Sequence, residues 1–307
     1  MDTTASQSLP YHIPALLPEA INLLDIQPEG TYIDATFGGG GHSRAILEKL
    51  NEKGRLFSFD RDMDSYQNRI PDPRFTFVHG NFRHIINFMR YYGVEKVDGI
   101  LADFGVSFHH FDTPERGFSF RSDSPLDMRM NQAASKTAAD YLSEADEKSL
   151  LSIFKAYADL KKPALVVKAI LNSRNQTPII STLQLAQAVR PVLDPRQEKK
   201  ELAQVFQALR IAVNHEADDL QIFLTSTLQV LKPGGRLVTL TYHSMEDRMV
   251  KNFFKTGNVE GREEKDFFGN LNSKWKLITR KPIEATEEEV ERNPRARSAR
   301  LRAAQLL

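Results

Sequence analysis

The sequence predicts an α/β fold, with a mostly parallel sheet that is interrupted by a helical insertion. Three observations support this prediction: β-rich runs alternate with stretches of helical spacing from residue 31 to residue 103, long helical patterns follow, and the alternation then resumes. The last strands need partners that the first half of the chain supplies. We therefore expect one domain formed by residues 1–113 and 202–307, and an inserted helical domain formed by residues 114–201.

The first half of the chain alternates predicted strands and helices. The strands are Thr31–Thr36, Arg55–Phe59, Phe75–His79 and Val97–Ala102. The helical stretches are Ser43–Leu50, Met63–Ile70 and Phe82–Tyr92. Three of these strands end in or near an aspartate, namely Asp34, Asp60 or Asp103. Because ligands in open α/β sheets bind outside the carboxyl ends of the strands, we expect the three carboxylates to face one crevice.

The middle of the chain has the spacing of helices. Its predicted helices are Ala138–Leu151, Ser152–Lys162 and Leu183–Val192. Alternation resumes with a helix that ends near Leu231, a turn over Lys232–Gly235 and a strand over Arg236–Tyr242. A helix over Glu246–Lys255 and a β-like run over Trp275–Lys281 complete the predicted order.

Composition excludes several function classes. The 41 Lys and Arg residues balance 40 Asp and Glu residues, so net charge predicts neither a nucleic-acid partner nor a membrane partner. The chain has no cysteine, which excludes disulfides, thiolate nucleophiles and Fe–S clusters. His109, His110 and Asp112 lack a third histidine at ligand spacing, so no metal is expected. With no signal peptide and no long apolar stretch, we expect a soluble, cytoplasmic protein.

Four consecutive glycines give the strongest local signal. Gly38–Gly41 follow a predicted strand and precede a helix, so a ligand can approach backbone N–H groups without clashing with Cβ atoms. The Gly-Lys-Ser/Thr end of a Walker A loop is absent, and a dinucleotide fingerprint fits from neither Gly38 nor Gly39. The remaining class is S-adenosylmethionine, which has no phosphate. Its ribose diol needs an acidic acceptor, and Asp60 is placed for that role.

Two further motifs follow predicted strands at the same sheet edge. Asp103–Gly105 partly matches the short acidic motif of enzymes that methylate exocyclic amines. Tyr242 and His243 end a later strand, where a substrate base would arrive. Ser244 and Asp247 are expected to cap the helix that follows.

The C-terminal end is rich in arginine. Residues 292–307 contain no acidic residue, and their arginines are Arg292, Arg295, Arg297, Arg300 and Arg302. Arginines next to a catalytic edge suit phosphate contacts, and we expect Arg295, Arg297 and Arg300 to bind RNA. The alternative is an ordinary solvated face.

Eight motifs occur in an order that resembles the bacterial 16S ribosomal RNA (cytosine-N4)-methyltransferase family. The motifs are His12–Leu17, Asp34–Ser43, Asp98–Ser107, Glu115–Ser119, Pro125–Met130, Phe206–Asn214, His243–Arg248 and Asn293–Ser298. They span nearly the whole chain. Tyr242-His243 and Glu264–Gly269 are most similar to the Bacteroidetes branch of this family.

The resemblance implies a class I S-adenosylmethionine-dependent methyltransferase fold with an inserted helical domain for substrate recognition. It implies S-adenosylmethionine as donor and a cytidine in the decoding centre of 16S rRNA, within the small ribosomal subunit, as acceptor. The cofactor contacts that carry over are Gly40, Gly41, His42, Asp60, Phe82 (beside the adenine) and Asp103. His110 stands where the family usually has a glutamine, and we expect it to take over that contact. We expect a monomer or homodimer, with no metal and no membrane partner.

The chemistry assigns roles to the residues at this edge. Cytosine N4 is a poor nucleophile because its lone pair is delocalised into the ring, so the enzyme must position N4, accept its N–H hydrogen bonds and take a proton. We expect Asp103 to accept these hydrogen bonds and His243 to act as the base or to position it. An aromatic side chain, Phe104, Phe108 or Tyr242, is expected to stack on the cytosine.

Two other function classes remain open from the sequence. An S-adenosylmethionine enzyme with a small-molecule substrate explains the first domain but not the arginines. A non-catalytic RNA-binding factor explains the arginines but not Gly38–Gly41 together with Asp60. Methylation at cytosine C5 is disfavoured, because that route needs a cysteine nucleophile.

Overall fold

A computed structural model describes residues 14–105, 113–264 and 273–307. The chain divides into two compact units: unit 1 is Met1–Gly105 with Asp219–Leu307, and unit 2 is Val106–Asp218. These boundaries differ from the predicted ones at residues 114 and 201. Helix α9 (Glu198–Val213) belongs to unit 2, because its apolar face is buried in the core of that unit. The insertion therefore extends one helix further than predicted.

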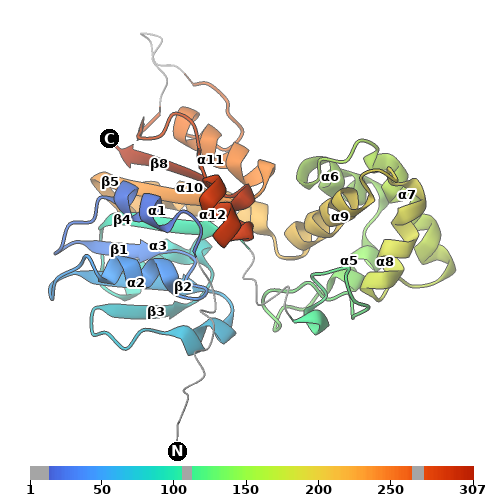
Figure 1. The fold of residues 1–307 in the computed structure, drawn as a ribbon, viewed down its shortest axis with the longest axis horizontal. Coiled ribbons are helices and arrows are strands. Elements are labelled where there is room, and N and C mark those ends of the chain that lie inside the picture. Colours follow the sequence, from blue (N-terminus) through green and yellow to red (C-terminus); the bar gives the residue numbers. More distant parts are fainter. Residues whose placement is uncertain (1–13, 106–112, 265–272) are drawn as a thin grey trace, which may run out of the picture. The chain divides into compact units, whose positions relative to one another are not determined.

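Unit 1 contains an eight-stranded sheet in the order β3-β2-β1-β4-β5-β8-β6, with β7 paired to β8 (Figure 1). The strands are β1 (Thr31–Asp34), β2 (Arg55–Asp60), β3 (Phe75–His79), β4 (Val97–Phe104), β5 (Leu231–Thr241), β6 (Trp275–Leu277), β7 (Ile283–Glu284) and β8 (Arg300–Leu306). Strands β1 to β5 pair in parallel, and β8 is antiparallel to β5, β6 and β7. The predicted mostly parallel sheet is confirmed. The strand order reverses between β1 and β4, which is where open α/β sheets bind ligands.

Helices cover both faces of this sheet (Figure 1). They are α1 (Leu17–Leu24), α2 (Gly41–Leu47), α3 (Ile85–Tyr91), α10 (Glu216–Val230), α11 (Ser244–Thr256) and the short α12 (Glu287–Arg292). One hydrophobic core joins the sheet to α3, α10 and α11, and a second joins it to α1 and α2. Along β4, Ile100 and Ala102 face the first core, whereas Leu101 faces the second. Burial on both faces explains why the central strand β4 carries apolar residues that point to either side of the sheet.

Several elements of unit 1 differ from the prediction. The elements α1, β7 and α12 were not predicted, and the turn predicted over Lys232–Gly235 lies within the bounds of β5. The helix predicted over Met63–Ile70 is the 3₁₀ helix η1 (Met63–Asn68). Strand β8 was not predicted at all, because its arginines obscure an alternating apolar pattern. Leu301 and Ala303 face one core, while Ala304 and Leu306 face the other. The arginine-rich end is therefore in part a strand of the main sheet.

Unit 2 is helical. Its helices are α5 (Ala138–Glu144), α6 (Glu147–Tyr157), α7 (Pro163–Gln176), α8 (Thr182–Val189) and α9, with the 3₁₀ helices η3 (Pro114–Arg116) and η4 (Arg190–Val192). The single helix predicted over Ala138–Leu151 is wrong. Asp146 interrupts it and caps α6, because its Oδ1 accepts a hydrogen bond from Ser149 N at 2.7 Å.

One family motif of unit 2 has a structural explanation. In Pro125–Met130, Met128 has a φ of 59°, an uncommon value for a residue other than glycine. Asn214, just after α9, holds this loop: its Oδ1 accepts from Met130 N and its Nδ2 donates to Met128 O, both at 2.7 Å. The two motifs therefore stabilise each other.

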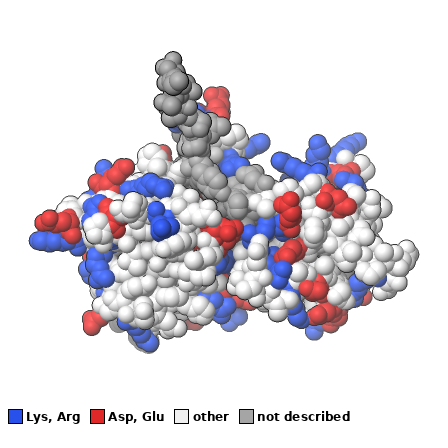
Figure 2. All heavy atoms as spheres, turned by 90° about the horizontal axis from the view of Figure 1, so that it is seen from below, with Lys and Arg blue, Asp and Glu red and all other residues white. Residues whose placement is uncertain are grey.

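The described parts of the chain contain no helix that is long and apolar enough to cross a membrane. Nor do the same residues gather three or more potential metal ligands in one place. Figure 2 shows Lys and Arg side chains interspersed with Asp and Glu over the face that it displays. The net charge of +1 is too small to attract a charged partner, so any such attraction must come from individual charged side chains.

Candidate active site

Three aspartates lie at the carboxyl edge of the unit 1 sheet. Asp34 ends β1, Asp60 ends β2, and Asp103 is the next-to-last residue of β4, which pairs with β1. The loop after β1 is tied to β4, since Asp103 N donates a hydrogen bond to Thr36 Oγ1 at 2.6 Å and Ala35 N donates to Leu101 O at 2.8 Å. The point where the strand order reverses is thus lined by carboxylates.

The glycine loop is held by its own chain. Gly38 and Gly40 have φ values of 50° and 75°, which favour glycine. Gly38 N donates to Asp60 Oδ2 at 2.9 Å, and Gly40 N donates to Phe37 O at 2.7 Å. Arg44 Nη1 also donates to Gly39 O at 2.7 Å. Two of the N–H groups that the sequence assigned to a ligand therefore already donate hydrogen bonds within the chain.

Packing adds a second reason for glycine at two of these positions. A Cβ atom on Gly40 would lie 2.9 Å from the Phe37 ring, and one on Gly41 would lie 2.2 Å from Pro14 Cγ. Glycine is therefore required here by close packing of the chain as well as by φ. The cofactor contacts of Gly40 and Gly41 stay predictions.

Asp60 retains room for one more hydrogen bond. Its Oδ2 accepts from Gly38 N and from Ser65 Oγ, the latter at 2.6 Å, and its Oδ1 accepts from Asp62 N at 2.8 Å. A carboxylate has about four acceptor positions, so one on Oδ1 is left over within the described part of the chain. Burial raises the pKa of Asp60 above its ordinary value of 3.8. Ser65, which sequence reasoning missed, fixes the orientation of this carboxylate.

His42 is buried between two of the aspartates. Its Nδ1 lies 3.8 Å from Asp103 Oδ2, and burial lowers the pKa of His42 although the charge of Asp34 raises it. The ring is therefore neutral at pH 7. Among the residues that the structure describes, none forms a hydrogen bond with its buried Nε2. Asp34 itself is fully buried, and burial raises its pKa even though Ser43 Oγ donates to it at 2.6 Å.

Tyr242 contacts Asp103 from the end of β5. Burial, the charge of Asp103 and a hydrogen bond to Asp103 together raise the pKa of Tyr242 well above 10. The hydroxyl therefore stays protonated and donates to the Asp103 carboxylate. The ring lies against Gly105, where a Cβ atom would be 3.0 Å from Tyr242 Cε2. The structure thus favours Tyr242 as an orienting partner of Asp103 over the predicted stacking role.

The first turn of α11 is closed by a glutamate. Glu246 Oε2 accepts from Tyr242 N at 2.9 Å and from His243 N at 3.2 Å, so His243 is the residue that precedes the helix. The predicted cap by Ser244 is wrong, because Ser244 already lies inside the helix. Glu246 holds Tyr242 and His243 at the carboxyl edge, and its i+3 spacing from His243 was the signal that could have identified it.

Asp247 was predicted to cap the same helix and instead binds arginines of β8. Arg302 donates to it through Nε at 2.7 Å and through Nη2 at 3.2 Å, and both side chains are buried. Arg300 Nη1 lies 3.4 Å from Asp247 Oδ2, and its Nε lies 3.7 Å from Glu284. Arg300, predicted to bind RNA, is thus paired with two carboxylates of its own chain.

Arg295 and Arg297 differ from the arginines of β8. Both lie on η5 (Pro294–Ser298) and are exposed, whereas Ala296 between them is fully buried. The buried alanine anchors the turn to the core and leaves the two guanidinium groups at the surface. The phosphate contacts predicted for these two residues stay predictions.

Phe82 lies at the carboxyl end of β3, as the first residue of the 3₁₀ helix η2 (Phe82–His84). Its ring is partly buried against Phe223 at 5.1 Å and Phe104 at 5.8 Å between centroids. This places an aromatic side chain at the same edge as Asp60. His110 and Phe108 lie outside the described residues.

These residues fit S-adenosylmethionine. Asp60 offers an acceptor for the ribose hydroxyls, Phe82 offers an aromatic edge for the adenine, and Asp103 is a carboxylate of which 14% of the side chain is exposed, suited to a cationic donor. His42 Nε2 adds a buried polar atom that is not satisfied within the described chain. The cofactor assignments therefore agree with the geometry and stay predictions.

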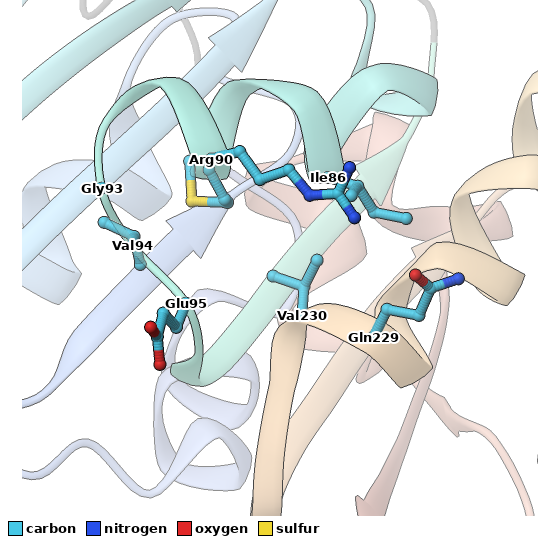
Figure 3. A pocket seen from close by; sticks show the side chains of 8 residues that line it. Ile86, Arg90, Gly93, Val94, Glu95, Gln229 and Val230 are labelled. Atoms are coloured by element: carbon cyan, nitrogen blue, oxygen red, sulfur yellow. The ribbon is translucent and has the colours of Figure 1, made fainter.

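A cavity of about 450 Å³ lies at the opposite edge of the sheet (Figure 3). It is lined by α3 and the end of α10, including Arg90, Glu95 and Gln229. Because these residues precede β4 and β5, the cavity lies at the amino ends of the strands. It contains none of the predicted site residues.

Comparison with known proteins agrees with this geometry. The profile described as the MraW methylase family matches residues 10–307. A protein of Bacteroides thetaiotaomicron named ribosomal RNA small subunit methyltransferase H is 54% identical over 97% of this chain and 98% of its own length. Proteins of the same name from Parabacteroides distasonis and Christiangramia forsetii are 53% and 47% identical, over 96% and 97% of this chain and 97% and 98% of their own lengths.

These matches confirm the predicted resemblance, including its Bacteroidetes branch. They also agree with the sheet order, and the predicted class I methyltransferase fold is confirmed. The chain therefore belongs to the MraW methylase family.

Proposed function

We propose that this chain transfers a methyl group from S-adenosylmethionine to the exocyclic N4 of a cytidine in the decoding centre of 16S rRNA. Membership of a methylase family and relatives named for the small-subunit rRNA support the reaction and the substrate class. The N4 atom and the decoding centre rest on the motifs of the cytosine-N4 family. The observation that carries the proposal is the carboxyl edge, where Asp60 and Asp103 lie together with Tyr242.

The donor is held by residues at the ends of β1 to β4. Asp60 Oδ1 has an acceptor position for a ribose hydroxyl, and Phe82 would pack beside the adenine. His42 and the backbone of Gly40 and Gly41 would hold the amino-acid part of the donor. When bound, S-adenosylmethionine supplies an electrophilic methyl group on a sulfonium.

Asp103 prepares the acceptor. Its carboxylate accepts a hydrogen bond from the N4 amino group, which draws the nitrogen lone pair out of conjugation with the ring. Tyr242 donates its hydroxyl to Asp103 and so holds the carboxylate in place. When N4 accepts the methyl group, the electron pair of the broken sulfur–methyl bond would stay with the donor and N4 would lose a proton. His243, at the start of α11, takes this proton.

RNA binding is assigned to unit 2 and to two arginines of η5. Unit 2 serves as the substrate-recognition domain, and the exposed Arg295 and Arg297 contact phosphates. The substrate is the RNA within the small ribosomal subunit, which places the reaction in the cytoplasm. The enzyme acts there as a monomer or homodimer.

The test is methylation of small-subunit RNA in vitro. Purified protein is incubated with small subunits that lack the modification and with S-adenosylmethionine carrying a trideuterated methyl group. Mass spectrometry of the digested nucleosides should find the label in N4-methylcytidine, and Asp103→Asn should remove most of it. Label in C5-methylcytidine, or no label with folded wild-type protein, would contradict the proposal. Free 16S rRNA in a parallel reaction shows whether the assembled subunit is needed.

A further inference from the structure

Asp219 is a deeply buried carboxylate in the first part of α10. Only 2% of the residue is exposed, and three side chains contact it. Asn81 Nδ2 donates at 2.5 Å, Arg83 Nη1 donates at 2.8 Å, and Arg61 Nη1 lies 3.6 Å away. These partners come from the segments that follow β3 and β2 at the carboxyl edge. A charge so deeply buried persists in proteins when it is paired in this way.

The contact with Asn81 determines how the chain enters η2. Asn81 directs its amide Nδ2 toward Asp219, so its Oδ1 points the other way and accepts from Arg83 N at 3.0 Å. That hydrogen bond caps η2, whose first residue is Phe82. Asp219 therefore positions the backbone of Phe82 through one intermediate side chain, and Arg83 supplies a second tie to the same turn.

The ring of Phe82 is held by the same helix. Phe223 follows Asp219 by one turn of α10 and lies 5.1 Å from Phe82 and 5.7 Å from Phe104. The rings of Phe82 and Phe104 are 5.8 Å apart, so the three form one edge-to-face cluster. Helix α10 thus holds both the backbone and the ring of Phe82.

We propose that Asp219 is a positioning residue for the adenosine part of the donor site. The inference rests on the proposed function, which places the adenine beside Phe82. Asp219 also restrains Arg61, the residue that follows the ribose-binding Asp60. It touches neither donor nor acceptor and acts through Asn81, Arg83 and Arg61. Loss of its charge should therefore weaken donor binding and leave the methyl-transfer step intact once the donor is bound.

The test is a comparison of donor affinity with turnover. Calorimetry measures binding of S-adenosylhomocysteine, and steady-state assays on small subunits give kcat and the KM for S-adenosylmethionine. Asp219→Asn should weaken S-adenosylhomocysteine binding about 10-fold and raise KM by a similar factor, as expected for loss of a charge-assisted hydrogen bond. The kcat at saturating donor should change less than about 2-fold, because the lost interaction is the same in ground state and transition state.

Two further variants complete the design. Asp98→Asn is the matched control, because Asp98 accepts hydrogen bonds from Thr31 N and Lys232 Nζ, both at 2.8 Å, at the opposite edge of the sheet. It should leave S-adenosylhomocysteine affinity and KM unchanged. Arg83→Gln replaces a side chain that is 34% exposed and should fold even if Asp219→Asn does not. It should weaken binding about 3-fold, because Asp219 keeps its other partners.

The outcomes separate the inference from the function on which it rests. Unchanged S-adenosylhomocysteine affinity in folded Asp219→Asn, or in Arg83→Gln where only that variant folds, overturns the positioning role. A fall in kcat with KM unchanged also overturns it. Equal weakening in Asp98→Asn shows a general effect on the fold and overturns it as well. Wild-type protein that binds no S-adenosylhomocysteine contradicts the proposed function, and this inference with it.

Discussion

The two edges of the unit 1 sheet differ in how they accommodate the charge of their aspartates. At the amino edge, Asp98 forms an ion pair with Lys232 at 2.8 Å. At the carboxyl edge, Asp34 and Asp60 accept hydrogen bonds from hydroxyl and backbone N–H groups, and burial raises the pKa of both. Within the described residues, no Lys or Arg forms an ion pair with either of them.

This difference suggests that the amino edge of the sheet contributes to stability and the carboxyl edge to function. A buried carboxylate without a cation makes folding less favourable, whereas one paired with lysine is compensated within the chain. Such arrangements cluster at functional sites, which agrees with a donor site at this edge of the sheet. We therefore expect substitutions at the carboxyl edge to change activity, and substitutions at the amino edge to change stability alone.

The largest effect is expected at Asp103. Asp103→Asn should lower the single-turnover rate of methylation at saturating donor and RNA by about 100-fold or more, since general-base and acceptor groups contribute roughly 10²–10⁴-fold. Tyr242→Phe keeps the ring against Gly105 but removes the hydroxyl that orients Asp103, so it should cost less. A normal rate in Asp103→Asn would assign the acceptor role to another group, with His243 next to be tested.

The second effect concerns Asp60 and pH. Asp60→Asn should weaken donor binding about 10-fold, because a hydrogen bond to a charged group contributes roughly 1.5–3 kcal/mol. The raised pKa of Asp60 means that its ionised form is lost at a higher pH than the ordinary 3.8 as the solution is acidified. Wild-type affinity for S-adenosylhomocysteine should therefore fall on acidification at a pH where a normal aspartate would still be charged.

Calorimetry across an acid series measures this dependence. Asp60→Asn should bind weakly at every pH and lose that part of the dependence. A variant with the same pH profile as the wild type would show that the titrating group lies elsewhere.

The third effect compares Arg295 and Arg297, which are exposed on η5, with Arg300 of β8. Arg295→Ala and Arg297→Ala should each weaken RNA binding and lower the magnitude of the salt slope by roughly one, since each removes one phosphate contact. Arg300→Ala is the control, because Arg300 is paired with Asp247 and Glu284. RNA affinity measured over a salt titration should be unchanged in this control. An equal change in all three slopes would mean that the ion pairs open on RNA binding.

The smallest effect on activity is expected at the amino edge. Asp98→Asn should lower the free energy of unfolding by about 1 kcal/mol, because it weakens one partly exposed ion pair and one hydrogen bond to Thr31 N. Donor affinity and methylation rate should not change. Denaturant unfolding and calorimetry on the same preparation measure both quantities. A loss of donor affinity here would remove the functional distinction between the two edges.

The parts of the fold that the sequence predicted well are those with a strong local signal. Strands β1 to β4 are mostly apolar runs bounded by turns, and the ends of β1, β2 and β4 lie at or next to Asp34, Asp60 and Asp103. Strand β8 was missed because its arginines dominate the composition, although Leu301 and Ala303 keep the alternation of a strand. The buried guanidinium group of Arg302 is paired with the carboxylate of Asp247, and only folding brings these two residues together.

Prediction of the site residues from sequence was limited in the same way as prediction of the fold. Asp60 and the glycine loop follow a local pattern of strand, turn and helix, so they could be proposed from spacing. The hydrogen bond between Tyr242 and Asp103 could not be predicted, because it joins two separate strands. Asp219 has no motif of its own and meets Asn81 across 138 positions of sequence. Contacts of this kind depend on tertiary packing and leave no periodic signal.

The central claim is that the donor binds at the carboxyl edge of the sheet, and a crystal structure with S-adenosylhomocysteine tests it most directly. We expect the ribose hydroxyls within hydrogen-bond distance of Asp60 and the adenine beside Phe82, with the sulfur facing Asp103. The chain offers another concave site, the cavity near Arg90 and Gln229 at the amino edge (Figure 3). A ligand bound in that cavity, with Asp60 and Phe82 uncontacted, would contradict the account.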